Sequence, residues 1–373
     1  MNRFVPPSMH ASIATLALLI AVVGCGPERS PTPAPPAEPA HAAAPAAPPV
    51  NSIERIASTV SAADRTQSET RVAALLARIE TNPPTPRVLF SVPVSNCDRY
   101  VGQGGAYEDC FLMQGLFYAY EGGDPWGLGN LFVDAAGRFW QTDQALGRVV
   151  AFDLKGKRLH IVSLVGPNSG VTNVWHVTDD EVRIEPYEDS PKIASIARYS
   201  LDGTFRGSAP IDTNASWWSL TRLPGEQNRF VSFRSVSNYR VVDAKYTGNR
   251  VTFSAPSELR SGGHRYGFVC IENSGTLVID DYATAVPGCG GLRYVGADGG
   301  VVLDMYPDRS TFPAALQYDS HAKLAGAALG AVAKETLSQG SVGPVAIGPD
   351  GKAYSYIARK RRVDFVEVPF VAP

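Results

Sequence analysis

The sequence has few charged residues and no long run of charge of one sign. Lysine, arginine, aspartate and glutamate make up 19% of the chain, below the roughly 25% of an average globular protein. The formal net charge is −2, and no basic stretch provides the surface on which nucleic-acid binding depends. We therefore expect no nucleic acid among the partners.

Short catalytic motifs are also lacking. The sequence contains no G-x-S-x-G, H-E-x-x-H, P-loop or EF-hand pattern, so we assign no catalytic residue, no metal ligand and no cofactor. Carboxylates gather at Glu185, Glu188 and Asp189, and again at Asp280 and Asp281. Calcium prefers such oxygen ligands, but carboxylates exposed on loops give the same pattern. Calcium is the one cofactor that the sequence leaves open.

Long hydrophobic runs are confined to the start of the chain. The apolar stretch from 11 to 23 follows Arg3 and is shorter than the roughly 18 residues that span a bilayer. It is typical of a secretory signal peptide, here residues 1–24. The stretch ends in Val22-Val23-Gly24-Cys25, an order that resembles the lipobox of bacterial lipoproteins.

The lipobox resemblance implies that Cys25 is the lipidation site. It would carry a diacylglyceryl thioether, become the mature N-terminus and receive a further acyl chain such as palmitate. Two or more acyl chains hold a protein at a membrane where one holds it only marginally. Gly26 stands where the family's inner-membrane retention signal has Asp. The resemblance thus implies a lipid anchor in the cell envelope, at the outer membrane, on its periplasmic or surface face.

The lipidated cysteine is followed by two segments of different composition. Residues 25–50 are rich in proline and alanine and cannot bury enough apolar surface to fold, which predicts a disordered tether. Residues 51–82 show an apolar periodicity that predicts a helical segment. Its apolar face favours packing against the domain that follows, and its polar middle, residues 64–71, predicts a break into two helices.

The remaining residues, 83–373, repeat a pattern of short apolar strands joined by turns with Asp and Gly. Successive turns near residues 134, 179, 224 and 272 lie about 45 residues apart, the period of a propeller blade. We take Phe268–Gly275 as the first strand of the fourth copy and Leu292–Gly299 as its third. Residues 318–324 predict a hairpin, and residues 325–337 an inserted helix or loop. The fold class is therefore all-β, a β-propeller.

One copy of the repeat carries a family resemblance. The segment Asp134–Asp153, read DAAGRFWQTDQALGRVVAFD, resembles an NHL repeat, as found in six-bladed propellers. The resemblance implies that Asp143 fixes a turn. We predict six blades, with five as the alternative, closed by pairing residues 88–94 with residues 363–370, which leaves no open sheet edge.

The four cysteines that remain after Cys25 form an even set in an exported chain, which favours disulfides. Of the three pairings, we choose Cys97–Cys110 and Cys270–Cys289, the first across a glycine-rich loop and the second within one blade. A thiolate metal site is the competing interpretation. The absence of C-x-x-C spacing disfavours it.

These features favour a non-enzymatic binding or interaction module. His176 and Trp175 lie on an expected inner strand, and Trp217 and Trp218 supply an aromatic pair suited to a rim. The partner would be the membrane through the anchor, together with a protein, glycan or small ligand. One alternative is a calcium-dependent enzyme that resembles lactonase propellers and acts as a hydrolase. The other is a scaffold for envelope assembly.

Overall fold

The structure is a computed structural model. The residues that it describes are 52–95, 116–117, 119–121, 124–126, 128–143, 147–164, 173–185, 195–210, 217–223, 226–234, 239–247, 250–253, 259–271, 274–288, 291–305, 314–330, 345–359 and 362–373. Residues 1–48 and 49–373 form two separate units, and only the second contains described residues.

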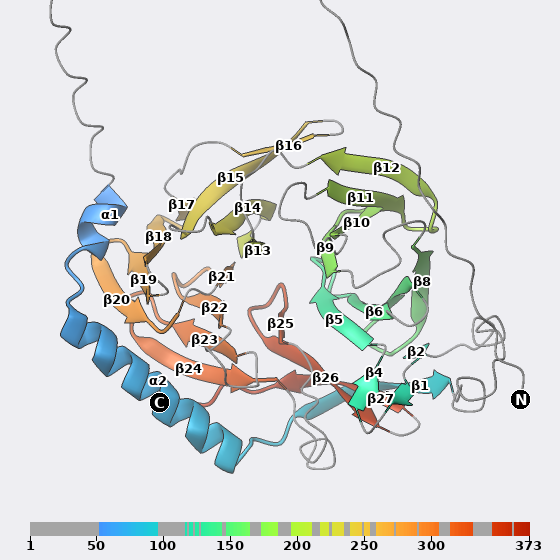
Figure 1. The fold of residues 1–373 in the computed structure, drawn as a ribbon, viewed down its shortest axis with the longest axis horizontal. Helices are drawn as coiled ribbons and strands as arrows, with labels where there is room; N and C mark the ends of the chain where they lie inside the picture. Colours follow the sequence, from blue (N-terminus) through green and yellow to red (C-terminus); the bar gives the residue numbers. More distant parts are fainter. Residues whose placement is uncertain are drawn as a thin grey trace, which may run out of the picture. The chain divides into compact units, whose positions relative to one another are not determined.

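Strands dominate the second unit, and consecutive strands pair antiparallel into small sheets (Figure 1). One four-stranded sheet has the order β5-β6-β7-β8 and a second has the order β9-β10-β11-β12. Their bounds are β5 Leu128–Val133, β6 Phe139–Asp143, β7 Arg148–Phe152, β8 Arg158–Ser163, β9 Asn173–Val177, β10 Glu181–Glu185, β11 Ser195–Ser200 and β12 Phe205–Pro210.

The strands that follow pair in the same way. β13 to β16 pair in chain order, as do β17 to β20 and β21 to β24. Their bounds are β13 Trp217–Leu223, β14 Glu226–Arg234, β15 Tyr239–Thr247, β16 Arg250–Phe253, β17 Leu259–Ser261, β18 His264–Ile271, β19 Ser274–Ile279, β20 Tyr282–Val286, β21 Gly291–Val295, β22 Val301–Met305, β23 Ala314–Tyr318 and β24 Leu324–Leu329.

The last sheet joins the two ends of the described chain. β25 Ala346–Ile347, β26 Ala353–Arg359 and β27 Arg362–Val368 continue into β1 Arg87–Ser95. β1 and β27 pair antiparallel, with Ser91 opposite Asp364, which confirms the predicted closure between the first and last strands. Three short strands complete the set: β2 Leu116–Phe117, which pairs with β1, and β3 Ala119–Glu121 and β4 Asp124–Trp126, which pair with each other.

The fold is all-β, built from four-stranded antiparallel sheets in the manner of a β-propeller. First strands of successive sheets lie together, β25 against β5, β5 against β9, and β9 against β13. Single pairings from β13 to β21 and from β15 to β18 also join three groups of strands into one larger sheet. The number of blades therefore stays a prediction.

A recurring turn explains the Asp and Gly signals in the sequence. At Asp134 the backbone N–H donates to the Arg138 carbonyl, and the Gly137 N–H donates back to the Asp134 carbonyl. Gly137 has φ 76°, a conformation that glycine adopts without strain. The same two backbone bonds recur in the turns that begin at Asp153, Ser200, Gly296, Asp319 and Gly348. These turns join first to second strands or third to fourth strands.

Three details of the predicted repeat are wrong. The Phe268–Gly275 segment is not a first strand, because it includes the end of β18 and the start of β19, and β17 precedes both. Leu292 is not in a third strand, because it lies in β21, which begins a new group of strands. The hairpin over 318–324 is confirmed, but β24 occupies residues 324–329, where we expected an inserted helix or loop. β24 buries small residues such as Ala327 and Ala328, and this composition made the strand resemble a helix or loop.

Two helices precede the strands, α1 Ser52–Ala57 and α2 Ala62–Thr81. The break predicted within residues 64–71 is wrong: it lies at residues 58–61, and the polar residues follow the solvent side of α2. Ser61 and Asp64 form a capping box that begins α2. None of the described helices is long and apolar enough to cross a membrane.

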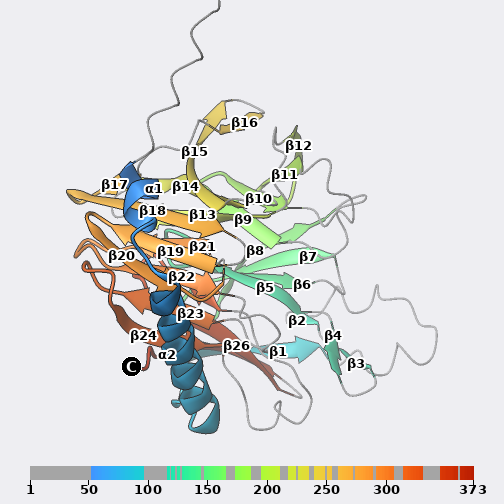
Figure 2. The same cartoon turned by 60° about the vertical axis from the view of Figure 1, so that its left-hand side comes forward.

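The apolar face of α2 packs on the outermost strands β20 and β24, along which the helix runs (Figure 2). Four predicted residues of this face are buried in one core with strand residues such as Leu277 and Leu316; they are Val72, Leu75, Leu76 and Ile79. Ser68 donates from its hydroxyl to the Ala285 carbonyl at 2.6 Å. The helix thus covers edges that would otherwise expose unpaired strand groups.

Candidate functional site

A row of polar side chains crosses the β9–β12 sheet. His176 of β9 lies opposite Arg183 of β10, and Arg183 lies opposite Arg198 of β11. Directly opposed residues of antiparallel strands place their side chains on the same face of the sheet. Three polar side chains therefore share one face. We call it the polar face and define it by His176, Glu181, Arg183, Arg198 and Arg206.

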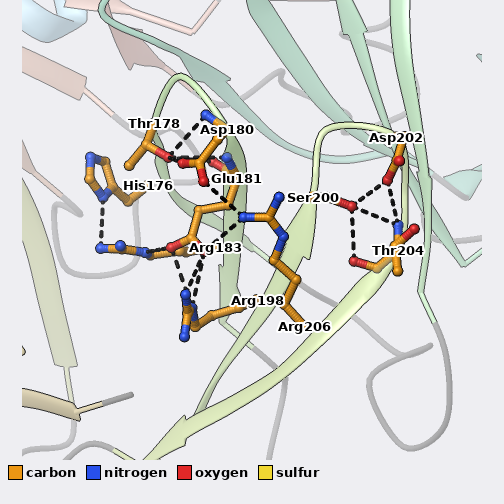
Figure 3. Close-up of polar contacts among 10 residues, drawn as sticks. All are labelled: His176, Thr178, Asp180, Glu181, Arg183, Arg198, Ser200, Asp202, Thr204 and Arg206. Carbon is orange, nitrogen blue, oxygen red and sulfur yellow. Dashed lines mark hydrogen bonds and ion pairs between the residues drawn. The ribbon is translucent and has the colours of Figure 1, made fainter. Parts of the chain in front are cut away.

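Glu181 is the buried centre of the polar face, with 2% of its surface exposed. Its carboxylate accepts from Arg183 Nε at 2.6 Å and from Arg198 Nη2 at 2.8 Å (Figure 3). Burial alone would raise the pKa of Glu181, but the hydrogen bonds from Arg198 and Arg183 outweigh burial and lower that pKa. Two guanidinium groups thus share one ionised carboxylate.

His176 is buried beside the same arginines, with 5% of its surface exposed. Its Nδ1 lies 3.3 Å from Arg183 Nη1. A guanidinium has only donors, so Nδ1 accepts this hydrogen bond.

A second ion pair borders the polar face. Arg206 of β12 donates from Nη1 to Asp180 at 2.8 Å, and its Nη1 lies 3.9 Å from Glu181 Oε2. Hydrogen bonds from Arg206 and Thr178 lower the pKa of Asp180. In the β11–β12 turn, Asp202 instead bonds to Ser200 and Thr204 (Figure 3). Asp180, Glu181 and Asp202 are thus each held by named donors.

The opposite face of the same sheet is apolar. Val182, Ile184 and Tyr199 alternate with the polar residues along β10 and β11 and pack with Trp140 and Val149 of the preceding sheet. One face thus binds the sheet to its neighbour through apolar contact. The other keeps charged groups only partly covered, because the Arg183 and Arg198 side chains remain 15% and 20% exposed.

The structure describes only some of the predicted site residues. His176 belongs to the polar face, and Trp175 precedes it in β9, whereas Trp217 and Trp218 begin β13. The side chains of these tryptophans lie outside the described part, as do Cys25, Cys97, Cys110 and Cys289. Cys270 lies in β18. The lipid anchor and both disulfides therefore stay predictions.

Asp143 forms an ion pair between the ends of β6 and β7, whereas the turn that the repeat resemblance assigns to it, at residues 144–146, lies outside the described residues. Its carboxylate accepts from Arg148 Nε at 2.9 Å, and both side chains are buried at the connection from β6 to β7. Among the described residues, no three His, Cys, Asp or Glu side chains gather as metal ligands.

Sequence reasoning missed Glu181, Arg183 and Arg198. The signal was present in the alternation of Glu181-Val182-Arg183-Ile184, which places charge on one face and apolar residues on the other. A strand between two packed sheets is expected to be apolar on both faces. Arginine and glutamate together on an inner strand therefore indicate a face with a role other than apolar packing.

No family model matches the chain, and no curated protein matches it. Among solved structures, it is similar to the calcium-binding protein regucalcin from Agrobacterium tumefaciens, with 12% identity, 66% of this chain and 92% of that chain covered, and a TM-score of 0.36.

Two further solved structures are similar at the same level. Virginiamycin B lyase from Staphylococcus aureus has 13% identity, with 65% of this chain and 80% of that chain covered and a TM-score of 0.35. The Dos1 propeller has 10% identity, with 69% and 74% covered and a TM-score of 0.34. At such low similarity, the fold rests on the strand pairing described above, and no activity is transferred from these proteins.

Proposed function

We propose that the chain is an exported lipoprotein, moored by acyl chains on Cys25, whose propeller binds an anionic ligand at the polar face. The observation that carries the binding role is the pair Arg183 and Arg198, held side by side by one buried carboxylate, Glu181. Guanidinium groups fixed in this way present donors in a planar fork that suits carboxylate and phosphate groups.

Partial exposure supports the same role. The Arg183 and Arg198 side chains keep 15% and 20% of their surface exposed, so a ligand can reach them from solvent. Arg206 adds a third guanidinium at the edge of the face, on the outermost strand of the sheet. A ligand carrying a carboxylate or phosphate would therefore find oriented arginines without rearranging the sheet.

Thermal unfolding of the full chain tests the binding role. The protein in detergent is compared in chloride, inorganic phosphate and succinate at equal ionic strength. A ligand at a hundred times its Kd stabilises a protein by about 2.7 kcal/mol, so phosphate or succinate should raise the Tm above that in chloride. Arg198→Gln should remove this shift, whereas Arg158→Gln, an exposed arginine on β8, should keep it.

The outcomes separate the chemistry and the site. A shift in phosphate alone identifies a phosphate ligand, and a shift in both anions identifies a general anion site. Equal shifts in Arg198→Gln and the unaltered protein would place the anion elsewhere. The absence of any shift would show the proposal to be wrong.

The tether is tested separately in cells. Cys25→Ser should abolish labelling by an alkynyl fatty acid and move the protein from the membrane to the soluble fraction. Cys97→Ser is the matched control and should keep both the label and the membrane location. Undiminished labelling of Cys25→Ser would contradict the lipid anchor but would not affect the proposed binding role.

A further inference from the structure

A histidine and an aspartate form a dyad on the β17–β20 group of strands. His264 begins β18, and Asp280 lies between β19 and β20. His264 Nδ1 lies 2.7 Å from Asp280 Oδ2, and Asp280 Oδ1 accepts the Arg265 backbone N–H at 2.8 Å. Two contacts thus hold the carboxylate against the imidazole.

The dyad fixes the orientation of the imidazole. Burial would raise the pKa of Asp280, but hydrogen bonds from His264 and the Arg265 backbone outweigh burial and lower that pKa. The carboxylate is therefore an ionised acceptor, and the His264 proton belongs on Nδ1. When the ring is neutral, its Nε2 lone pair points away from Asp280. This is the arrangement of a general base with its orienting carboxylate.

Two turns of the next group of strands face that lone pair. A β-carbon built on Gly299, in the β21–β22 turn, would lie 2.8 Å from His264 Nε2 and 3.0 Å from the Ser320 β-carbon. His264 Nε2 and the Ser320 β-carbon are thus no farther apart than the sum of these distances. Glycine leaves the space between them open. Within the described ranges, neither Nε2 nor the Ser320 hydroxyl forms a hydrogen bond.

A buried hydroxyl lies beside the dyad. Tyr266 is two residues from His264 on the same face of β18, and their ring centroids are 6.2 Å apart. Tyr266 is 1% exposed, and its hydroxyl has no hydrogen-bond partner among the described residues. A buried polar group without a partner destabilises the folded protein. Such a group is expected where a ligand or water supplies the partner.

We propose that Ser320 as nucleophile, His264 as general base and Asp280 as orienting carboxylate hydrolyse carboxylic esters. The Ser320 hydroxyl oxygen bonds to the ester carbonyl carbon while its proton passes to His264 Nε2. The bond to the alcohol oxygen then breaks, and that oxygen takes the proton from Nε2. Water repeats the sequence on the acyl-serine, and the carboxylic acid leaves. Rotation about the Ser320 side-chain bond brings its oxygen toward Nε2, as free enzymes often require.

A fluorophosphonate probe tests this site on the full chain in detergent. The probe should label Ser320, identified by peptide mass spectrometry, and Ser320→Ala should not be labelled. His264→Gln should slow labelling by about a hundredfold or more, the usual contribution of a general base. His321→Gln is the matched control and should react at the unaltered rate, because His321 contacts Tyr282 and takes no part in the dyad.

Three outcomes would overturn the proposal: no label on Ser320, label only on another residue, or an unchanged rate in His264→Gln. Circular dichroism shows whether each variant is folded. Should His264→Gln fail to fold, Asp280→Asn takes its place, because it removes the carboxylate that orients the His264 ring. Labelling of Ser320 should slow in Asp280→Asn, and an unchanged rate would contradict the role of the dyad. Anion binding at the polar face is independent of each result.

Discussion

Ile53 of α1 occupies the space that a side chain on Gly267 of β18 would need. A β-carbon built on Gly267 would lie 2.2 Å from Ile53 Cγ2, far inside van der Waals contact. Gly267→Ala should therefore destabilise the protein by about 1–3 kcal/mol, the usual cost of overpacking. Urea unfolding followed by circular dichroism measures the change.

The matched control removes the neighbour. An Ile53→Ala background removes Cγ2 and Cδ1, the two atoms nearest to the added methyl of Gly267→Ala, and leaves the residue 53 β-carbon at 3.2 Å. The cost of Gly267→Ala should therefore fall by more than half in this background. Contacting residues are coupled in a double-mutant cycle, whereas distant ones are additive within about 0.5 kcal/mol. Additive costs would show that α1 does not rest on Gly267.

Gly156 and Gly137 have the same φ angle but different neighbours. A substitution at each therefore tests the effect of the neighbouring atoms separately from the effect of the φ angle. Both occupy the fourth position of the recurring turn, and both have φ 76°. A β-carbon on Gly137 meets nothing within 4 Å, whereas one on Gly156 would lie 2.9 Å from the Phe90 ring. Gly137→Ala should cost about 1–2 kcal/mol from the left-handed conformation alone. Gly156→Ala should cost more, and equal losses in urea unfolding would contradict the contact with Phe90.

The recurring turn also explains how much of the fold the sequence predicted. In the turn at Asp134, the Asp134 carboxylate accepts the backbone N–H groups of Ala136 and Arg138. Residues within the turn satisfy these bonds, so the signal is local and readable. Strand positions next to such turns were predictable for the same reason. The pairing of the two terminal strands was predictable for another reason, because closing the ring leaves no open sheet edge.

The polar face was not predictable, because it depends on which surfaces meet. Alternation along β10 shows that Glu181 and Arg183 share a face, but it does not show what covers that face. The dyad was not predictable for a similar reason. Pairing between β18 and β19 brings His264 and Asp280 together, and Ser320 lies near them only because a neighbouring group of strands packs there. Contacts between sheets leave no periodic signal in one sequence.

The buried pair Asp143 and Arg148 should show the asymmetry expected of ions in a protein interior. Removing one partner leaves an uncompensated buried charge, which costs about 3–5 kcal/mol, whereas replacing both by apolar residues is often neutral. Arg148→Met should therefore destabilise strongly, and Asp143→Leu with Arg148→Met should recover most of that loss in urea unfolding. A double variant as unstable as Arg148→Met would show that the pair has essential further contacts.

Glu181 should make the stability of the protein depend on pH. Its pKa in the folded protein is below the ordinary value of 4.5, so the unfolded chain takes up its proton first as the pH falls. This contribution is fully present well above pH 4.5 and is lost as the pH falls through that value toward the folded pKa. The free energy of unfolding should thus decrease more between pH 7 and about 3.5 in the unaltered protein than in Glu181→Gln. Glu69→Gln, an exposed change on α2, should behave like the unaltered protein. Identical pH dependence in Glu181→Gln and the unaltered protein would contradict an ionised Glu181 held by Arg198 and Arg183.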